Sequence, residues 1–328
     1  MDDHLRSLAT HNGGYLHRAD ILQNAGSDEM IRHAMARGEL RRIRVGTYAF
    51  ANTWDPLQAQ ERHVVLARSV IDKFPAGSVA LSHHSAAAVH GIELYDVDLS
   101  AVHLVRLDGG SGRRESNVVH HDARPLPADL MVVDERLVVC PSRAVWEVAC
   151  MSSARGALVV MDSALHQGLI LPEHLADQSG RYRAWPGARS ARLWVRLADG
   201  GAENPGETLF RFTCFEAKLP RPDTQVPVTD AEGDVIAFTD LGWELYRHCG
   251  EFDGLRKYWR DLRPGEDASD VVVREKVRED RIRSLDLGMT RSTWAEVQPD
   301  RSEHTGARLA HDLERSHRLY GRGRRHIA

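Results

Sequence analysis

Hydrophobic and polar positions in residues 1–54 are spaced for three short helices followed by a β-hairpin. Leu5 lies on the apolar face of the first helix. Ser27 is placed to cap the third helix, and the acidic residues in the first turn of that helix favour its dipole. Between residues 40 and 50, apolar and polar positions alternate around Gly46, which predicts two strands joined by a tight turn. This order of elements is typical of a winged helix, so we predict a DNA-binding domain over residues 1–54.

Basic side chains gather on the third helix and on the hairpin of this domain. In winged helices the third helix enters the major groove and the wing contacts phosphates. The predicted DNA-binding residues are Arg32, His33 and Arg37 on the helix and Arg41, Arg42 and Arg44 on the hairpin. A small helical bundle with a solvated basic loop is the alternative interpretation of the same pattern.

Residues 55–200 alternate between short apolar runs and amphipathic segments, which is typical of an α/β domain. The predicted strands cover residues 78–82, 101–105, 117–120 and 137–140, and the predicted helices cover 57–73, 83–90, 142–151 and 154–167. Histidines are dense here, at positions His83, His84, His90, His103, His120 and His121. Because no HxxxH pair on a clear helix and no nearby cysteine accompanies them, we interpret them as buried or hydrogen-bonded rings rather than as metal ligands.

Residues 201–299 form a third block with the predicted order α-β-β-β-α-β. The predicted elements are a helix over 207–218, strands over 224–228, 235–240 and 245–251, a helix over 270–285 and a strand over 288–294. This order fits a small mixed sheet flanked by helices. Residues 300–328 are polar and rich in arginine, so we predict a flexible basic tail. The sequence therefore predicts a multidomain α/β protein.

Acidic residues recur at the ends of two strands in this third block. Asp240 ends one predicted strand, and Glu251 and Asp253 follow at the end of the next. Because residues i and i+2 of a strand share a face, these carboxylates can converge across the hairpin, where they repel one another unless a cation joins them. Oxygen-rich sites of this kind suit Mg²⁺ or Mn²⁺, which indicates phosphoryl chemistry. Ordinary strand-end acids are the plainer interpretation.

With these residues in view, the third block resembles the PD-(D/E)XK nuclease superfamily, and most closely its small Vsr-like members. The matching pieces are Pro205-Gly-Glu207, Asp240, Glu251-Phe-Asp-Gly254, Glu275-Lys-Val-Arg-Glu-Asp280 and Thr293-Trp294. The resemblance implies that Glu207, Asp240 and the acidic pair gather around Mg²⁺. The superfamily usually has a lysine where this chain has Asp253, and Lys257 could move in from the next turn to orient the attacking water. The predicted backbone contacts to DNA are Lys276, Arg278 and Arg283.

The N-terminal block and part of the middle one resemble AbiEi-type antitoxins of type IV toxin–antitoxin systems. The resemblance is carried by the winged helix, by Leu81-Ser-His-His-Ser85 and by Pro141-Ser-Arg143. It implies a winged helix that binds promoter DNA. Actinobacterial chains that join such parts to a nuclease-like domain are the closest overall match.

Two functions from different classes follow from these patterns. The first is a metal-dependent endodeoxyribonuclease whose winged helix holds the target, with Mg²⁺ or Mn²⁺ as cofactor. The second is an antitoxin-like transcriptional repressor with a catalytically silent nuclease fold. DNA is the expected partner of both, together with a cognate toxin or a second copy of the chain. The charge pattern alone leaves RNA cleavage open as a third function.

Charge, cysteine content and the absence of long apolar runs limit where the protein is expected to act. The chain has 328 residues and a net charge of -4, so contacts to DNA must come from local basic patches. Its four cysteines are scattered without a CxxC pair, which argues against a zinc ribbon and a disulfide framework. There is no apolar run of the ~20 residues that span a bilayer, and the N-terminus lacks the apolar core of a signal peptide. We therefore expect a cytoplasmic protein without a membrane partner.

Overall fold

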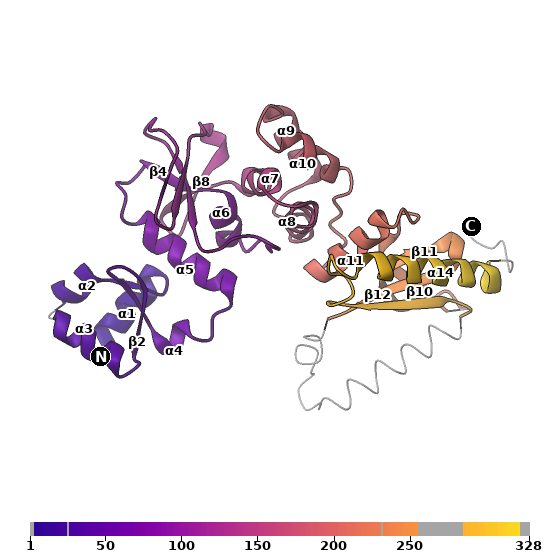
Figure 1. Ribbon diagram of the computed structural model, residues 1–328, viewed down its shortest axis with the longest axis horizontal. Helices are drawn as coiled ribbons and strands as arrows, with labels where there is room; N and C mark the ends of the chain where they lie inside the picture. Colours follow the sequence, from indigo (N-terminus) through magenta and orange to yellow (C-terminus); the bar gives the residue numbers. More distant parts are fainter. Residues whose placement is uncertain (1–2, 25, 231, 255–284, 322–328) are drawn as a thin grey trace. The chain divides into compact units, whose positions relative to one another are not determined.

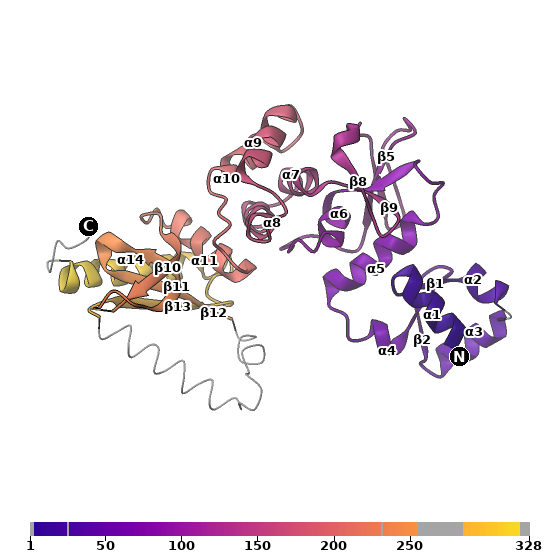
Figure 2. The same cartoon turned by 180° about the vertical axis from the view of Figure 1, so that it is seen from behind.

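A computed structural model describes residues 3–24, 26–230, 232–254 and 285–321, and within them the fold is a multidomain α/β fold with three sheets. The chain forms two compact units (Figures 1 and 2). The first unit comprises Met1–Val160 and Leu169–Arg196, and the second comprises Met161–Gly168 and Leu197–Ala328. In the described part of the chain, no helix is both long and apolar enough to cross a membrane.

The first unit begins with the predicted helices and hairpin. Its elements are α1 (Asp3–Asn12), β1 (Leu16–His17), α2 (Arg18–Gln23), α3 (Asp28–Ala36), β2 (Leu40–Arg44) and β3 (Thr47–Phe50). The three strands form an antiparallel sheet in the order β1-β3-β2. The Ser27 hydroxyl accepts a hydrogen bond from the Met30 amide at 3.1 Å, as expected for an N-cap. Gly46 has a φ of +68°, which the turn between β2 and β3 requires.

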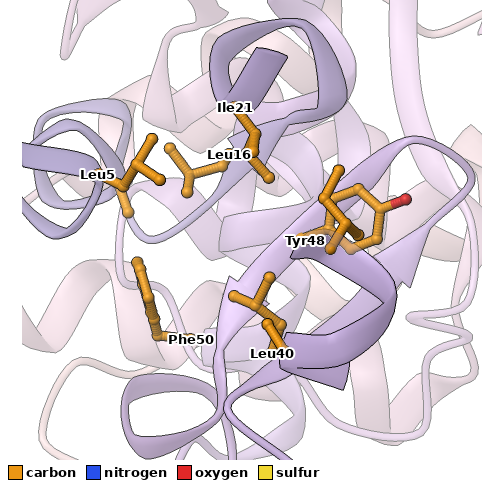
Figure 3. Close-up of a cluster of buried hydrophobic side chains, with 9 residues drawn as sticks. Leu5, Leu16, Ile21, Leu40, Tyr48 and Phe50 are labelled. Carbon is orange, nitrogen blue, oxygen red and sulfur yellow. The ribbon is translucent and has the colours of Figure 1, made fainter. Parts of the chain in front are cut away.

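Each element of this segment contributes an apolar side chain to one small core. Figure 3 shows six of these side chains converging from the helices and the hairpin, namely Leu5, Leu16, Ile21, Leu40, Tyr48 and Phe50. All six are buried, and Ile31 and Ala34 of α3 are buried in the same core, which fixes α3 and the hairpin relative to each other.

The remainder of the first unit is built on a six-stranded mixed sheet. The helices are α4 (Ala51–Trp54), α5 (Ala59–Ile71), α6 (His83–Val89), α7 (Pro141–Met151), the first half of α8 (Ala154–His166), α9 (Pro172–Arg181) and α10 (Ala188–Val195). The strands are β4 (Val79–Leu81), β5 (Val102–Arg106), β6 (Arg113–Glu115), β7 (Val118–His121), β8 (Leu130–Val133) and β9 (Arg136–Val139), in the order β6-β7-β5-β4-β9-β8. The four predicted strands and four predicted helices are confirmed with shifts of a few residues, whereas the edge strands β6 and β8 were not predicted.

The second unit contains a four-stranded sheet in the order β10-β11-β12-β13. Its elements are α11 (Pro205–Glu216), β10 (Asp223–Thr229), β11 (Val235–Trp243), the 3-10 turn η2 (Glu244–Tyr246), β12 (His248–Asp253), β13 (Gly288–Thr293) and α14 (Ser302–Tyr320). β10, β11 and β12 pair antiparallel, and β12 pairs parallel with β13. The helices α11 and α14 lie side by side (Figures 1 and 2). The predicted helix over 270–285 lies outside the described residues except for its last position.

The prediction of a flexible tail from residue 300 is wrong for residues 302–320, which form α14. Leu309 and Leu313 are almost fully buried in this helix, and the small residue Gly306 allows close contact with Ala217 beyond α11. The apolar stripe of α14 is narrow, and most of its other residues are polar or charged. The helical spacing of its few buried residues was therefore not recognised in the sequence.

The predicted boundary near residue 200 is close to the observed one, but residues 161–168 also belong to the second unit. Asp162 explains why. Its buried carboxylate accepts hydrogen bonds from Thr208 at 2.9 Å and from Arg211 at 2.5 Å, both on α11. The second half of α8 is thereby held against α11 by a buried ion pair.

Candidate active site

Asp240 lies where β11 and β12 stop pairing. The last regular position on this side of the hairpin is Leu241 opposite Gly250. Beyond it, Asp240 Oδ2 accepts a hydrogen bond from the Phe252 amide at 2.6 Å. The Asp240 side chain therefore makes the hydrogen bond that a backbone carbonyl would make in a regular ladder. Its partner, the Phe252 amide, lies between the other two predicted acids, Glu251 and Asp253.

Glu251 is buried on β12 and carries an ion pair that was not predicted. Its Oε2 lies 3.1 Å from Nη2 of Arg291, which occupies the matching register position on β13. The guanidinium neutralises one oxygen of Glu251. No local sequence signal identifies Arg291, because it meets Glu251 only through the parallel pairing of two strands that are distant in the chain.

Alternation along β12 separates its side chains onto two faces of the sheet. Phe252 faces α11, since a Cβ placed on Gly206 would overlap its ring. Glu251 and the half-buried Asp253 are the odd-numbered neighbours of Phe252, so they belong to the opposite face. The two acids of β12 thus share one face with Arg291, as their i, i+2 spacing predicted.

The Glu207 carboxylate accepts two hydrogen bonds from the residues that precede its own helix. One oxygen accepts a hydrogen bond from the Glu203 amide at 2.8 Å, and the other accepts from Nδ2 of Asn204 at 2.5 Å. Asn204 in turn caps α11, because its Oδ1 accepts hydrogen bonds from the amides of Gly206 and Glu207. Asn204 and Glu207 have the spacing of a capping box, a signal that was present in the sequence.

Oxygen ligands of this type fit Mg²⁺ or Mn²⁺ by their chemistry. Their spacing is wider than a closed ligand shell, because among the described residues no three carboxylates have ligand atoms within 4.8 Å of one another. Asp240, Glu251 and Asp253 would therefore have to rotate toward a shared ion. The other predicted residues of this domain, Lys257, Lys276, Arg278 and Arg283, lie outside the described residues.

The predicted DNA-binding residues of the first unit fall into two groups. Arg32, His33 and Arg42 are exposed on α3 and β2. Arg37 pairs with Glu39 at 2.8 Å and Arg41 pairs with Asp55 at 2.7 Å, while Arg44 is partly buried. Burial lowers the pKa of Arg44. The exposed group thus leaves basic side chains accessible on α3 and β2, the two elements on which the sequence predicted DNA contacts.

We expect Gly206→Ala to lower the free energy of unfolding by about 1–3 kcal/mol, because a methyl group there overlaps the buried ring of Phe252. Urea denaturation measures the change. The matched control is Gly254→Ala, whose Cβ would meet the same ring at 3.5 Å, an ordinary contact. Equal losses in both variants would contradict the close packing of α11 against β12.

No protein-family model matches the chain. The sequence is similar to two uncharacterized proteins of Mycobacterium tuberculosis, MT2308 from strain CDC 1551 / Oshkosh and Rv2248 from strain ATCC 25618 / H37Rv. Each is 26% identical to this chain over 281 residues, which cover 85% of this chain and 94% of the relative. The similarity therefore extends along most of both proteins.

Proposed function

We propose that this chain is a DNA-binding protein whose second unit is a metal-dependent endodeoxyribonuclease. The observation that carries the proposal is the position of Asp240. Its carboxylate bonds to the Phe252 amide, so it lies beside the main chain that joins Glu251 to Asp253. Three acids from two adjacent strands are thereby concentrated at the end of one sheet, which is an arrangement suited to a hard divalent cation.

In this proposal Asp240 and Glu251 hold Mg²⁺ or Mn²⁺, and Asp253 holds it directly or through water. The bound ion supplies Lewis acidity and lowers the pKa of a bound water. Arg291 supplies a positive charge that the missing lysine would otherwise contribute. Its guanidinium neutralises Glu251 in the ion-free protein and can pair with a phosphate when the carboxylate turns to the ion.

The winged helix provides the means of holding the substrate. Arg32 and His33 on α3 and Arg42 on β2 are exposed. Contacts from such side chains to the phosphate backbone weaken as salt is raised, because binding releases counterions. Binding through this surface is independent of the acids of the second unit, so binding and cleavage can be measured separately.

The test is nicking of supercoiled plasmid by the full chain in Mg²⁺ or Mn²⁺. We expect Asp240→Asn/Glu251→Gln to abolish nicking and to retain the gel shift of the wild type. These substitutions keep the shape of both side chains and remove the charges that would hold the ion. The matched control is Asp234→Asn/Glu244→Gln, which removes the two exposed acids that flank β11 and leaves nicking unchanged. Equal nicking by the wild type and the first double variant would overturn the assigned site.

The alternative is a transcriptional repressor with a silent nuclease fold. It is favoured by the absence, among the described residues, of any three carboxylates close enough to share an ion in the observed conformation. A gel shift with promoter DNA in the absence of any metal-dependent nicking, in both metals and on several DNA substrates, would support the repressor and overturn the nuclease. An Arg42→Ala variant with a weaker gel shift would then locate binding on the wing.

A further inference from the structure

His83 occupies an unusual backbone position in the first unit. It follows β4 and Ser82 and begins α6 with a φ of +49°, in the left-handed region that non-glycine residues seldom adopt. Its amide donates a hydrogen bond to Oε2 of the fully buried Glu147 at 2.9 Å, and its Nδ1 lies 3.3 Å from the same oxygen. Such strain persists only where neighbouring contacts impose it, and it is concentrated at functional sites.

Two further histidines reach His83 from the adjacent parallel strands β5 and β7. Their register pairs His103 with Val119 and Val105 with His121, so the two histidines share one face of the sheet. His103 Nδ1 lies 3.0 Å from His121 Nε2. The rings of His121 and His83 are stacked, with centroids 3.6 Å apart. Three segments that are separate in sequence thus bring three imidazoles together.

Hydrogen bonds from neighbouring residues anchor the backbone of His103. The Ser85 hydroxyl accepts a hydrogen bond from the His103 amide at 2.9 Å and donates one to Nε2 of His63 at 2.9 Å. The His63 Nδ1 proton is donated to the Leu99 carbonyl at 2.8 Å, which fixes this tautomer. The backbone of His103 is therefore anchored through a chain of hydrogen bonds that passes through Ser85 on α6 and His63 on α5 to the Leu99 carbonyl.

The cluster is enclosed by the protein. His83 and His103 are buried, and His121 is partly buried. A fourth ring, that of His84, packs edge-on against His103, and its buried Nδ1 has no hydrogen-bond partner in the described part of the protein.

We propose that His83, His103 and His121 form a binding site for a divalent transition-metal ion such as Zn²⁺. One nitrogen from each ring lies within 4.8 Å of the others, and among the described residues this is the only group of three or more metal-ligand side chains that meets this criterion. Imidazole nitrogens select Zn²⁺, Ni²⁺ or Cu²⁺ over Mg²⁺, so this site is distinct in chemistry from the carboxylates of the second unit.

Glu147 gives His83 the orientation that a ligand needs. A carboxylate on one ring nitrogen of a metal-bound histidine fixes the ring and makes the other nitrogen more basic. With Nδ1 of His83 beside Glu147, Nε2 is the nitrogen directed to the ion. Because the rings of His83 and His121 are stacked, their nitrogens cannot both face an ion until one ring moves. His121, the member of the triad that is partly exposed, turns out of the stack so that its nitrogen also faces the ion.

The proposal reverses the interpretation of these histidines drawn from the sequence. That interpretation rested on the absence of an HxxxH pair, which detects ligands on a single helix. Here one ligand begins a helix and two lie on neighbouring strands, so the topology of the sheet brings them together.

The test uses the full chain, stripped of metal with a chelator and titrated with Zn²⁺ by calorimetry and with Co²⁺ by visible absorption. We expect one Zn²⁺ per chain in Asp240→Asn/Glu251→Gln, which lacks the carboxylates proposed to bind an ion in the second unit, and a d–d absorption band with Co²⁺ in both this variant and the wild type. His121→Gln should weaken Zn²⁺ binding at least about tenfold and remove the Co²⁺ band. The matched control is His120→Gln on the same strand, since residue 120 faces the other side of the sheet and its ring packs edge-on against Phe74.

Two further measurements keep the result specific to this site. Circular dichroism of the metal-free variants shows whether each remains folded, and the Co²⁺ band of the wild type needs no variant at all. Asp240→Asn/Glu251→Gln should keep the Co²⁺ band of the wild type, because the three histidines lie in the first unit and the substituted acids in the second. Equal Zn²⁺ affinity in the wild type and His121→Gln, or no Co²⁺ band in the wild type, would overturn the proposal.

Discussion

Arg143→Leu is expected to lower the free energy of unfolding of the first unit by about 3–5 kcal/mol, the cost of removing one partner from a buried ion pair. The Arg143 side chain is fully buried on α7. Its Nε donates to Glu147 at 2.8 Å, and its Nη1 donates to Asp129 at 2.9 Å and to the Tyr182 hydroxyl at 2.8 Å. Leucine fills part of the space but leaves the carboxylate of Glu147 buried without a cation. Urea denaturation followed by circular dichroism measures the loss.

The chain offers a matched control for this prediction. Arg181 also pairs with Asp129, at 3.2 Å, but about a third of its side chain is exposed. Because partly solvated ion pairs contribute little, we expect Arg181→Leu to cost less than about 1 kcal/mol. Arg143→Lys should fall between the two, since lysine keeps the charge and loses the planar fork that reaches both acids. Similar losses for Arg143→Leu and Arg181→Leu would contradict the assigned role of burial.

The same network links the stability of the first unit to its proposed metal site. Arg143 holds one oxygen of Glu147, and the other oxygen of Glu147 holds the amide of His83 in its left-handed conformation. We infer that Pro141-Ser-Arg143 and Leu81-Ser-His-His-Ser85, two motifs distant in sequence, form one structural unit through this glutamate. The sequence did not identify Glu147 as a buried residue, because a glutamate in an amphipathic helix is usually exposed.

The hydrophobic pattern predicted most of the fold because its periods are local. The cap at Ser27, the turn at Gly46 and the strands of the central sheet each follow from a few neighbouring residues. α14 escaped prediction because its buried positions are few and partly polar, with Thr305 and Ser316 alongside the leucines. Small polar residues add little to the apolar stripe by which an amphipathic helix is recognised. Only their tertiary contacts reveal that these positions are buried, since Thr305 bonds to the Glu296 carbonyl and Ser316 to His248 on β12.

The candidate site was predictable only in part, for a related reason. The order of Asp240, Glu251 and Asp253 follows from the hairpin, whose two strands are joined by a short turn. The partner Arg291 depends on parallel pairing across a long connection, which sequence spacing does not encode. Glu207 fits two patterns, that of the resemblance to nucleases and that of a helix cap, and two hydrogen bonds of its carboxylate go to the capping segment, from Glu203 and Asn204.

His248 provides the second large effect, a loss of stability in acid. Its ring is buried between β12, β13 and α14, where Nδ1 lies 2.8 Å from the Ser316 hydroxyl and Nε2 lies 2.9 Å from the Thr290 hydroxyl. Burial lowers its pKa from 6.5 to about 4, and the nearby Asp312 opposes this shift without cancelling it. Thr290 donates its own hydroxyl proton to Asp312 at 2.8 Å, so Nε2–H donates to Thr290 and Nδ1 accepts from Ser316. A proton added at Nδ1 would force the Ser316 hydroxyl to turn from donor to acceptor and would place a positive charge in a buried site.

The pKa difference fixes both the sign and the pH range of the effect. In the unfolded chain His248 takes up a proton as the pH falls through 6.5, whereas in the folded protein it does so only near 4. Between these values the unfolded state binds more protons, so this contribution is complete above about pH 6.5 and is lost as the pH falls toward 4. A shift of this size corresponds to about 3 kcal/mol.

We therefore expect the stability advantage of the wild type over His248→Gln to shrink by about 3 kcal/mol between about pH 7.5 and about pH 4. Urea denaturation of both proteins across this range measures the difference, and contributions from other histidines cancel in the comparison. His317→Gln changes an exposed histidine of α14 and should leave the slope of the wild type unchanged. A constant difference between the wild type and His248→Gln at every pH would mean that the folded and unfolded states bind protons at residue 248 equally, and that its burial has no electrostatic cost.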